Sequence, residues 1–263
     1  MDATDRFAEL VRGPADALRL SLDEAALLIA AHARPEHDPL DVPAYLGRLD
    51  ALAASCADPS ADAVLDRLFV VEGFTGDTET YYDARNSYLD QVIERRRGIP
   101  ITLSIVLVEV GRRLGVPFQP IGMPGHFLVR LGGQFIDPFE GGRFLSLEEC
   151  ADRFRSLYGD DVPFDATMLA PAEPLDIVAR MLANLRQVHL SRKDSVNLEW
   201  VLRLRGLLPT ASIEERAERA GVLAALGRFD TAADVLEDLV PDADDERARA
   251  LASKAKQLRA RLN

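Results

Sequence analysis

The fold is decided by a short stretch near the middle of the chain, residues 122–138, which read GMPGHFLVRLGGQFIDP. Apolar residues crowd both sides of Gly132-Gly133, and a glycine pair between two such runs favours a two-residue hairpin turn. The stretch therefore predicts two antiparallel strands, in which Leu131 pairs with Gln134. Residues 118–121 predict a further short strand just before it.

Two polar side chains of this hairpin come close to each other in the predicted register. Counting outward from the turn places Leu128 opposite Asp137. His126 lies two residues from Leu128 and hence on the same face of the hairpin. Diagonal neighbours of this kind are about 7–8 Å apart between their backbones, within reach of a histidine and a carboxylate. The spacing therefore allows a contact between His126 and Asp137.

A buried helix is predicted upstream of the hairpin, beginning at Pro100. Residues 101–110 read ITLSIVLVEV, and a helix that is apolar almost all round is a buried one. Proline suits the first turn of a helix because its missing N–H would have no partner there. Gly115 and then Pro117 end the helix.

The two flanks of this centre are predicted to be helical. Before residue 80, apolar residues recur at helical spacing in segments that prolines and glycines separate. After residue 173 more amphipathic helices follow, and the step Gly227, Phe229, Ala232 looks like a tetratricopeptide repeat. The predicted fold class is therefore α+β and predominantly α.

The chain is predicted to contain three regions. The first, residues 1–80, is a helical region that packs on the core. The second, residues 81–165, is the core with the central helix and the small antiparallel sheet. The third, residues 173–263, holds the helical repeats, whose concave face is a candidate groove for a peptide.

Composition and charge exclude several classes of protein. The chain has 263 residues, of which 48% are hydrophobic and 28% charged, as in ordinary globular proteins. A net charge of −12 argues against nucleic acid, because the phosphate backbone would be repelled. No apolar run approaches the roughly 18 residues of a membrane span, and the N-terminus has none of signal-peptide length. We therefore expect a cytoplasmic protein that binds neither nucleic acid nor membrane.

Cysteines and histidines predict neither a disulfide framework nor a metal site. Cys56 and Cys150 are too few for a disulfide scaffold and are expected to be free, buried thiols. The remaining histidines, His32, His37 and His189, have no partners at ligand spacing. No metal and no other cofactor is therefore predicted.

Five segments resemble the transglutaminase-like domain of a bacterial family known as SirC-type regulators, which couples this domain to C-terminal tetratricopeptide repeats. They are NSYL at 86–89, RRRGIPI at 95–101, GVP at 115–117, GMPGHF at 122–127 and IDPF at 136–139. The match is dense in the middle of the chain and loose in the flanks. It implies a papain-type core with N-terminal helices before it and tetratricopeptide-like helical hairpins after it.

The resemblance also implies that the usual nucleophile is missing. In active members of the wider superfamily a Gly-x-Cys opens the central helix and a Gly-x-Pro follows its end. Here Gly98 and Gly115 lie 17 positions apart, the spacing expected between those two glycines. The position of the cysteine then falls on Pro100, which has neither a thiol nor an N–H.

Three polar residues near the start of the central helix are candidate cleft residues, namely Asn86, Thr102 and Ser104. Ser104 lies one helical turn beyond Pro100 on the same face, about 6 Å along the helix axis. Thr102 points to a different face. Neither hydroxyl therefore replaces the cysteine without a shift of the helix. The basic run Arg95-Arg96-Arg97 is expected to be a solvated helix end whose charges suit the helix dipole.

Two functions follow from this sequence. The favoured one is a non-catalytic interaction or regulatory module that binds a protein or peptide through its C-terminal repeats, with His126 and Asp137 as a relic. The alternative is a weak or atypical hydrolase or acyltransferase, in which Asp137 orients His126 as a general base without a cysteine nucleophile. A structural subunit of a larger assembly is a third possibility.

Overall fold

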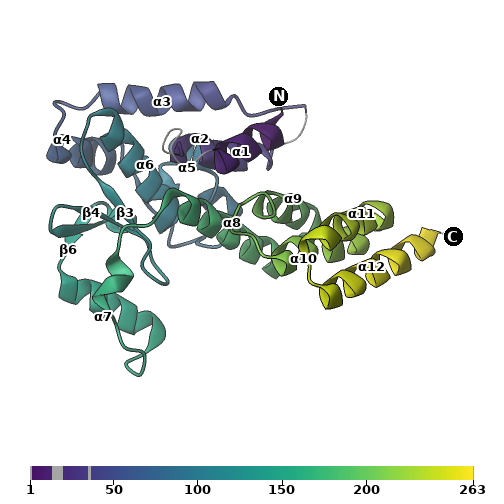
Figure 1. Cartoon of the computed structure of the whole chain (residues 1–263). Coiled ribbons are helices and arrows are strands. Elements are labelled where there is room, and N and C mark those ends of the chain that lie inside the picture. The colour runs from purple at the N-terminus through teal and green to yellow at the C-terminus, as the bar shows by residue number, and fades with distance from the viewer. Residues whose placement is uncertain (1, 14–19, 35–36, 263) are drawn as a thin grey trace. The chain divides into compact units, whose positions relative to one another are not determined.

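The computed structural model describes residues 2–13, 20–34 and 37–262. Helices dominate and two small sheets accompany them, which confirms the predicted α+β class (Figure 1). The described residues fall into two compact units. One lies within residues 18–181, and the other combines the N-terminal helix with residues 182–262. The three sequence regions stay a prediction about domain organisation.

In the first unit, several helices and helical turns precede the four-stranded sheet in the sequence. They are α2 (Leu22–Ala31), α3 (Val42–Ala54), α4 (Ala61–Leu65), the π-helical turn η1 (Asp66–Val71), the short 3-10 turn η2 (Ala84–Asn86) and α5 (Leu89–Arg95). A π-helical turn is rare and often lies near a functional site. The parallel pair β1 (Thr75–Gly76) and β2 (Arg97–Gly98) joins the segments around α5.

The centre of this unit is α6 (Pro100–Arg113). Its residues 100–111 are all buried, because α2, α3, α4 and α5 contact it from the helical side and β3 and β4 from the other. The helix begins at Pro100, as the sequence predicts, with Ile99 as the extended residue before it. Gly115 then takes a φ of 74°, a conformation that favours glycine, and the helix ends.

The second sheet follows α6 and carries the hairpin. Its strands are β3 (Gln119–Ile121), β4 (Leu128–Leu131), β5 (Gln134–Asp137) and β6 (Arg143–Leu145), in that order and all antiparallel. Leu131 pairs with Gln134, which confirms the predicted register. Gly132 adopts a φ of 58°, as the tight turn requires.

Helix α7 (Leu147–Tyr158) lies along one face of this sheet (Figure 1). Strand residues two apart point to the same face, so Phe135, Leu145 and their neighbours form one apolar cluster with Cys150 of α7. Ser146 and Glu149 form a capping box that fixes the start of α7. The 3-10 turn η4 (Ala166–Leu169) and the first turns of α8 (Pro174–Ser191) complete the unit.

The expectation of a solvated helix end is wrong for two arginines of the basic run before α6, which are half-buried, whereas Arg97 is exposed. Arg95 donates to Asp77 and to Asn86, at 3.1 and 3.0 Å. Arg96 donates to Glu72 through two nitrogens and takes a φ of 59°. Burial opposes ionisation of Asp77, yet hydrogen bonds from its neighbours lower its pKa to about 2. These ion pairs hold the chain that leads into α6.

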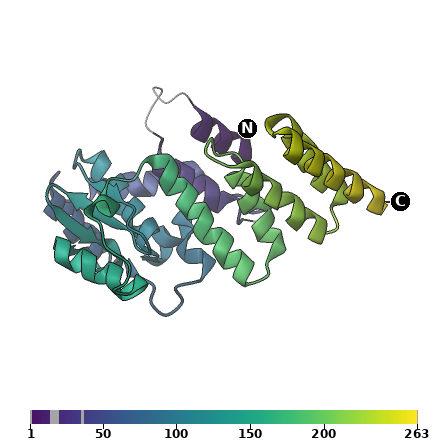
Figure 2. The same cartoon turned by 60° about the horizontal axis from the view of Figure 1, so that its bottom comes forward.

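The second unit consists of helices alone. They are α1 (Ala3–Arg12), the last turns of α8, α9 (Ser195–Arg205), α10 (Ile213–Ala225), α11 (Phe229–Leu239), the 3-10 turn η5 (Val240–Asp242), α12 (Asp245–Arg259) and the 3-10 turn η6 (Ala260–Leu262). Successive helices contact each other from α9 to α12, and in Figure 2 they are the green to yellow series. Small alanines let α10, α11 and α12 approach closely around Leu223 and Leu236. Among the described residues, no helix has the length and apolar content needed to cross a membrane.

Candidate functional site

The hairpin brings His126 and Asp137 together. Nε2 of His126 lies 2.8 Å from Oδ2 of Asp137, and both side chains are buried. The turn before β4 sets this geometry, because Gly125 takes a φ of 71° and directs the chain into the strand. The sequence register thus leads to a real contact.

Asp137 is saturated with hydrogen-bond donors. Its Oδ1 accepts from the backbone N–H of Phe139 at 2.9 Å and from that of Glu140 at 3.4 Å. Its Oδ2 accepts from His126 and from Arg153, whose Nη1 lies 2.5 Å away. A buried carboxylate with four donors is a structural anchor as well as a partner for the histidine.

Arg153 is a member of the site that sequence reasoning missed. It projects from α7, and its Nη1 lies 3.1 Å from Nε2 of His126. Both groups converge on the same oxygen of Asp137, which is the stronger acceptor, so we assign the Nε2 proton to the Asp137 bond. The other guanidinium nitrogen donates to Glu140. The Ser146 and Glu149 capping box was the sequence signal for the helix that carries Arg153.

A second arginine fixes the loop in front of His126. Arg180 of α8 donates to the backbone carbonyls of Met123 at 2.9 Å and His126 at 2.6 Å. Its guanidinium also lies over the ring of Phe127, 5.3 Å from the centroid. Burial lowers the pKa of Arg180, and in the described part of the chain no carboxylate pairs with it. The loop that carries His126 is therefore held through its own backbone.

His126 opens onto a pocket of about 740 Å³ between the sheet and α7. It is lined by Tyr81, Tyr82, Gly125, His126, Phe139, Glu140, Arg143, Leu145, Glu149, Asp152, Arg153, Ser156 and Leu157. The ring of Phe139 packs edge-on against those of Tyr81 and His126. Nδ1 of His126 takes no hydrogen bond from any described residue. The pocket thus combines one imidazole, aromatic walls and charges of both signs.

A sequence profile of the transglutaminase-like superfamily matches residues 20–183. The chain belongs to the transglutaminase-like superfamily. A UPF0162 protein of Xylella fastidiosa is 42% identical over 190 residues, which are 65% of this chain and 65% of that protein. The match thus spans slightly less than two thirds of that relative's length. A UPF0162 protein of Pseudomonas aeruginosa is 31% identical over 214 residues, 78% of each chain.

Similar proteins are also found in mammals. The F-box only protein 21 of the mouse is 32% identical over 153 residues, which are 54% of this chain and 23% of that protein. The transglutaminase-like segment is therefore a minor part of that longer chain.

In this transglutaminase-like domain the expected nucleophile position lies outside the pocket. Pro100 is buried and is not among the residues that line the pocket. A Cβ added to Gly76 would lie 2.5 Å from the ring of Phe139, so that ring rests directly on the β1–β2 pair. Phe139 therefore packs on β1, which pairs with β2, the strand just before Pro100.

The three candidate cleft residues are buried and do not line the pocket either. Thr102 donates its hydroxyl proton toward the carbonyl of Asn86 at 2.7 Å, and Asn86 donates from Nδ2 to the carbonyl of Thr80 at 2.8 Å. The hydroxyl of Ser104 is buried and has no partner among the described residues. Asn86 and Thr102 thus connect the turn before α5 to the start of α6.

Neither cysteine of the transglutaminase-like domain replaces the nucleophile. Cys150 is buried in the cluster between the sheet and α7, where burial raises the pKa of its thiol to about 11. Burial also raises the pKa of Cys56. Both thiols are free, as expected, but only Cys150 is buried, and the expectation of a buried Cys56 is wrong because its side chain is half-exposed. Within residues 2–13, 20–34 and 37–262, no group of three His, Cys, Asp or Glu side chains is placed to hold a metal ion.

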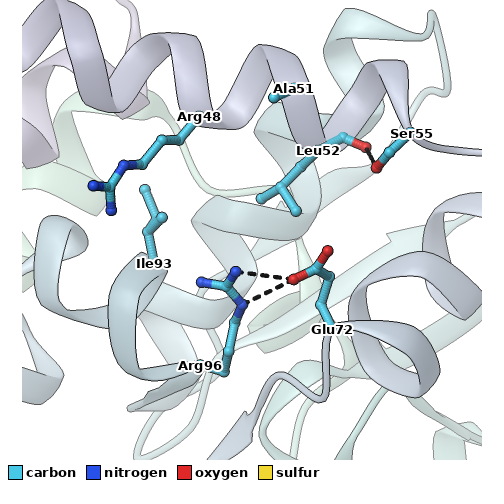
Figure 3. A pocket seen from close by; sticks show the side chains of 7 residues that line it. All are labelled: Arg48, Ala51, Leu52, Ser55, Glu72, Ile93 and Arg96. Atoms are coloured by element: carbon cyan, nitrogen blue, oxygen red, sulfur yellow. Dashed lines mark hydrogen bonds and ion pairs between the residues drawn. The ribbon is translucent and has the colours of Figure 1, made fainter.

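A smaller pocket of about 390 Å³ lies between α3 and the end of α5 (Figure 3). Figure 3 shows Arg96 paired with Glu72, with Leu52 and Ile93 beside them. Arg48 also lines this pocket and lies 3.5 Å from Glu94. No histidine is among the residues that line this pocket, so the pocket at His126 is the stronger candidate.

Proposed function

We propose that this protein is a non-catalytic, transglutaminase-like regulator that binds a segment of a partner protein. The observation that carries the proposal is Pro100 at the position of the nucleophile, buried beneath its neighbours. Proline has no thiol to form an acyl intermediate and no N–H to stabilise an oxyanion. The chemistry by which the superfamily would form a covalent intermediate is therefore unavailable at this position.

The bonding of Asp137 supports the same proposal. Its carboxylate anchors the turn at Phe139 and Glu140 and pairs with Arg153. These contacts give the His126–Asp137 pair a structural reason to persist without catalysis. The pair then holds one wall of a binding pocket.

The relatives and the C-terminal helices support a modular role. In F-box only protein 21 the similar segment covers 23% of the protein, as expected of a module within a larger assembly. We further propose that α10 and α11 form a tetratricopeptide-like pair that contributes to partner binding, as in the SirC-type family. A cytoplasmic location is part of this proposal.

Turnover measurements test the proposal. Amidase, esterase and transamidation assays compare the wild type with His126→Ala and with Ser156→Ala, a matched control at the exposed rim of the same pocket. We expect the same background rate from all three proteins. Activity that is lost in His126→Ala and kept in Ser156→Ala would overturn the non-catalytic assignment.

A second candidate function is a hydrolase that uses His126 as a general base on water. The observation that favours it is Nδ1 of His126, which has no partner among the described residues while Nε2 is held by Asp137. With the Nε2 proton on that bond, Nδ1 carries the lone pair that a base requires. This function predicts turnover that falls at least about a hundredfold in His126→Ala.

A further inference from the structure

The two edges of the four-stranded sheet differ. The outer edge of β3 is covered, because Ile121 forms a bridge with Pro171 and the N–H of Ala172 donates to the carbonyl of Pro120 at 2.9 Å. The outer edge of β6 pairs with no strand or bridge in the described part of the chain. An uncovered edge offers a row of backbone donors and acceptors to another chain.

Exposed apolar side chains lie in the uncovered edge strand and near it in the chain. Phe144 in β6 is 43% exposed, and Leu147 just after it is 51% exposed. On the other side the ring of Phe69 lies against Gly142, which places the π-helical turn η1 beside the start of β6. The last residues of that turn, Val70 and Val71, are 74% and 58% exposed. The exposed Phe144 on the edge strand, with the exposed Leu147 two residues beyond the end of that strand, marks a candidate interaction surface.

We propose that the outer edge of β6 binds an extended segment of a partner polypeptide, which adds a strand to the sheet. This inference rests on the proposed function and names the mode of docking. Main-chain hydrogen bonds would supply affinity, and alternate side chains of the segment would supply specificity.

The alternation of side chains along β6 determines which residue types the bound segment needs opposite Phe144 and opposite the pocket. Residues two apart in a strand share a face, so Arg143 and Leu145 point to one face and Phe144 to the other. Arg143 and Leu145 line the pocket at His126. Alternate side chains of the bound segment therefore lie beside Phe144 and beside the pocket. The side facing Phe144 requires an apolar residue.

The charged side chains around β6 determine which residue types the segment needs at its other positions. Three carboxylates, those of Asp137, Glu140 and Glu149, share the two guanidinium groups of Arg143 and Arg153, and the exposed Glu148 adds another negative charge beside Glu149. The whole chain carries a net charge of −12. Long-range attraction therefore favours a cationic partner, so the segment alternates apolar and basic residues.

A second copy of this chain fits the edge less well. Each copy carries the same negative charge, and edge-to-edge pairing would bring the two acidic rims together.

The test uses the full chain and synthetic peptides. The probe is a fluorescein-labelled peptide of sequence Lys-Val-Lys-Val-Lys-Val, and its fluorescence anisotropy reports binding. Two analogues accompany it: one is N-methylated at alternate residues, which removes backbone donors, and the other has glutamate in place of lysine. We expect saturable binding of the parent, weakened at least about tenfold in each analogue. Bound peptide should slow hydrogen exchange at the amides of residues 143–145.

Two variants sharpen the test. Phe144→Ser should weaken binding of the parent peptide several-fold, whereas Val196→Ser, at an exposed valine of α9, should leave it unchanged. Equal binding of the parent and N-methylated peptides, protection confined to other segments, or no saturable binding would each overturn the inference. None of these results bears on the non-catalytic assignment, which depends on turnover that requires His126.

Discussion

The two compact units of this protein hold their charges in different ways. The transglutaminase-like unit buries several carboxylates and pairs them with arginines far away in the sequence, as Arg113 pairs with Asp23 across 90 positions. In the helical unit, most ion pairs lie at the surface, as Arg259 does with Asp234 and Glu237. The buried Glu199, which pairs with Arg219, is an exception.

The difference shows which forces specify each unit. Burial alone would raise the pKa of Asp23, but hydrogen bonds from Ser21 and Arg113 outweigh it and lower that pKa. Burial and the charge of Asp23 raise the pKa of Glu109. Such networks require their distant partners, because a buried charge without a partner is strongly destabilising. The helical unit depends instead on apolar packing between neighbouring helices.

The largest effect is expected from removing the best-connected buried carboxylate. Asp137→Ala leaves Arg153 without its buried partner, which should lower the free energy of unfolding by about 3–5 kcal/mol. Urea unfolding followed by hydrogen exchange in α6 measures this loss. Asp152→Ala, whose side chain is 59% exposed, is the control and should change little. Equal effects of the two substitutions would contradict the anchoring role of Asp137.

A comparable loss in the helical unit is expected from apolar packing. Leu236 of α11 is fully buried between α10 and α12. Leu236→Ala should therefore lower the free energy of unfolding by about 2–5 kcal/mol. Trp200, the single tryptophan of the chain, lies in α9 and reports on this unit by fluorescence. Val196→Ala in the same helix is the exposed control. If the midpoint of the unfolding transition followed by Trp200 fluorescence is unchanged in Leu236→Ala, the apolar cluster of α10, α11 and α12 does not stabilise the unit.

A smaller, pH-dependent effect is expected from Asp77. Its pKa is lowered to about 2 in the folded chain, from 3.8 as the ordinary value. A lowered pKa stabilises the fold above pH 3.8, and this contribution, on the order of 2 kcal/mol, disappears as the pH falls toward 2. The free energy of unfolding, measured between pH 5 and pH 2, should therefore fall more steeply with decreasing pH in the wild type than in Asp77→Asn. Parallel curves would exclude this linkage.

The smallest effect is expected at the surface of the helical unit. Arg259 bonds three carboxylates, yet it is 41% exposed and screened by solvent. Arg259→Ala should leave the fluorescence midpoint of Trp200 within experimental reproducibility, at low salt and at high salt alike. A clear shift that added salt removes would show that surface ion pairs do stabilise this unit.

The sequence predicted the parts of the site that depend on local pattern. The Gly132-Gly133 turn fixed the strand register, and the register placed His126 near Asp137, where the structure shows a 2.8 Å contact. The apolar run from Pro100 predicted the central helix and its start. Periodicity and turn chemistry act over a few residues, so a single sequence is enough to reveal them.

Other members of the site came from residues far apart in the chain. Arg153 reaches Asp137 across 16 positions, and Arg180 reaches the carbonyl of His126 across 54. Arg96 was expected at a solvated helix end but pairs with Glu72, 24 positions away. No local pattern specifies such partners, because their proximity arises only when helices pack on the sheet.

The sequence by itself determined the hairpin and the buried helix, since each depends on residue type and short-range spacing, and its family resemblance placed Pro100 at the position of the cysteine. Tertiary structure alone decided that Asp137 carries four donors, that Phe139 packs on β1, and that the outer edge of β6 pairs with no strand among the described residues. The physical reason is the same for all three: hydrogen bonds, ring contacts and strand pairing across long sequence separations form only in the packed chain.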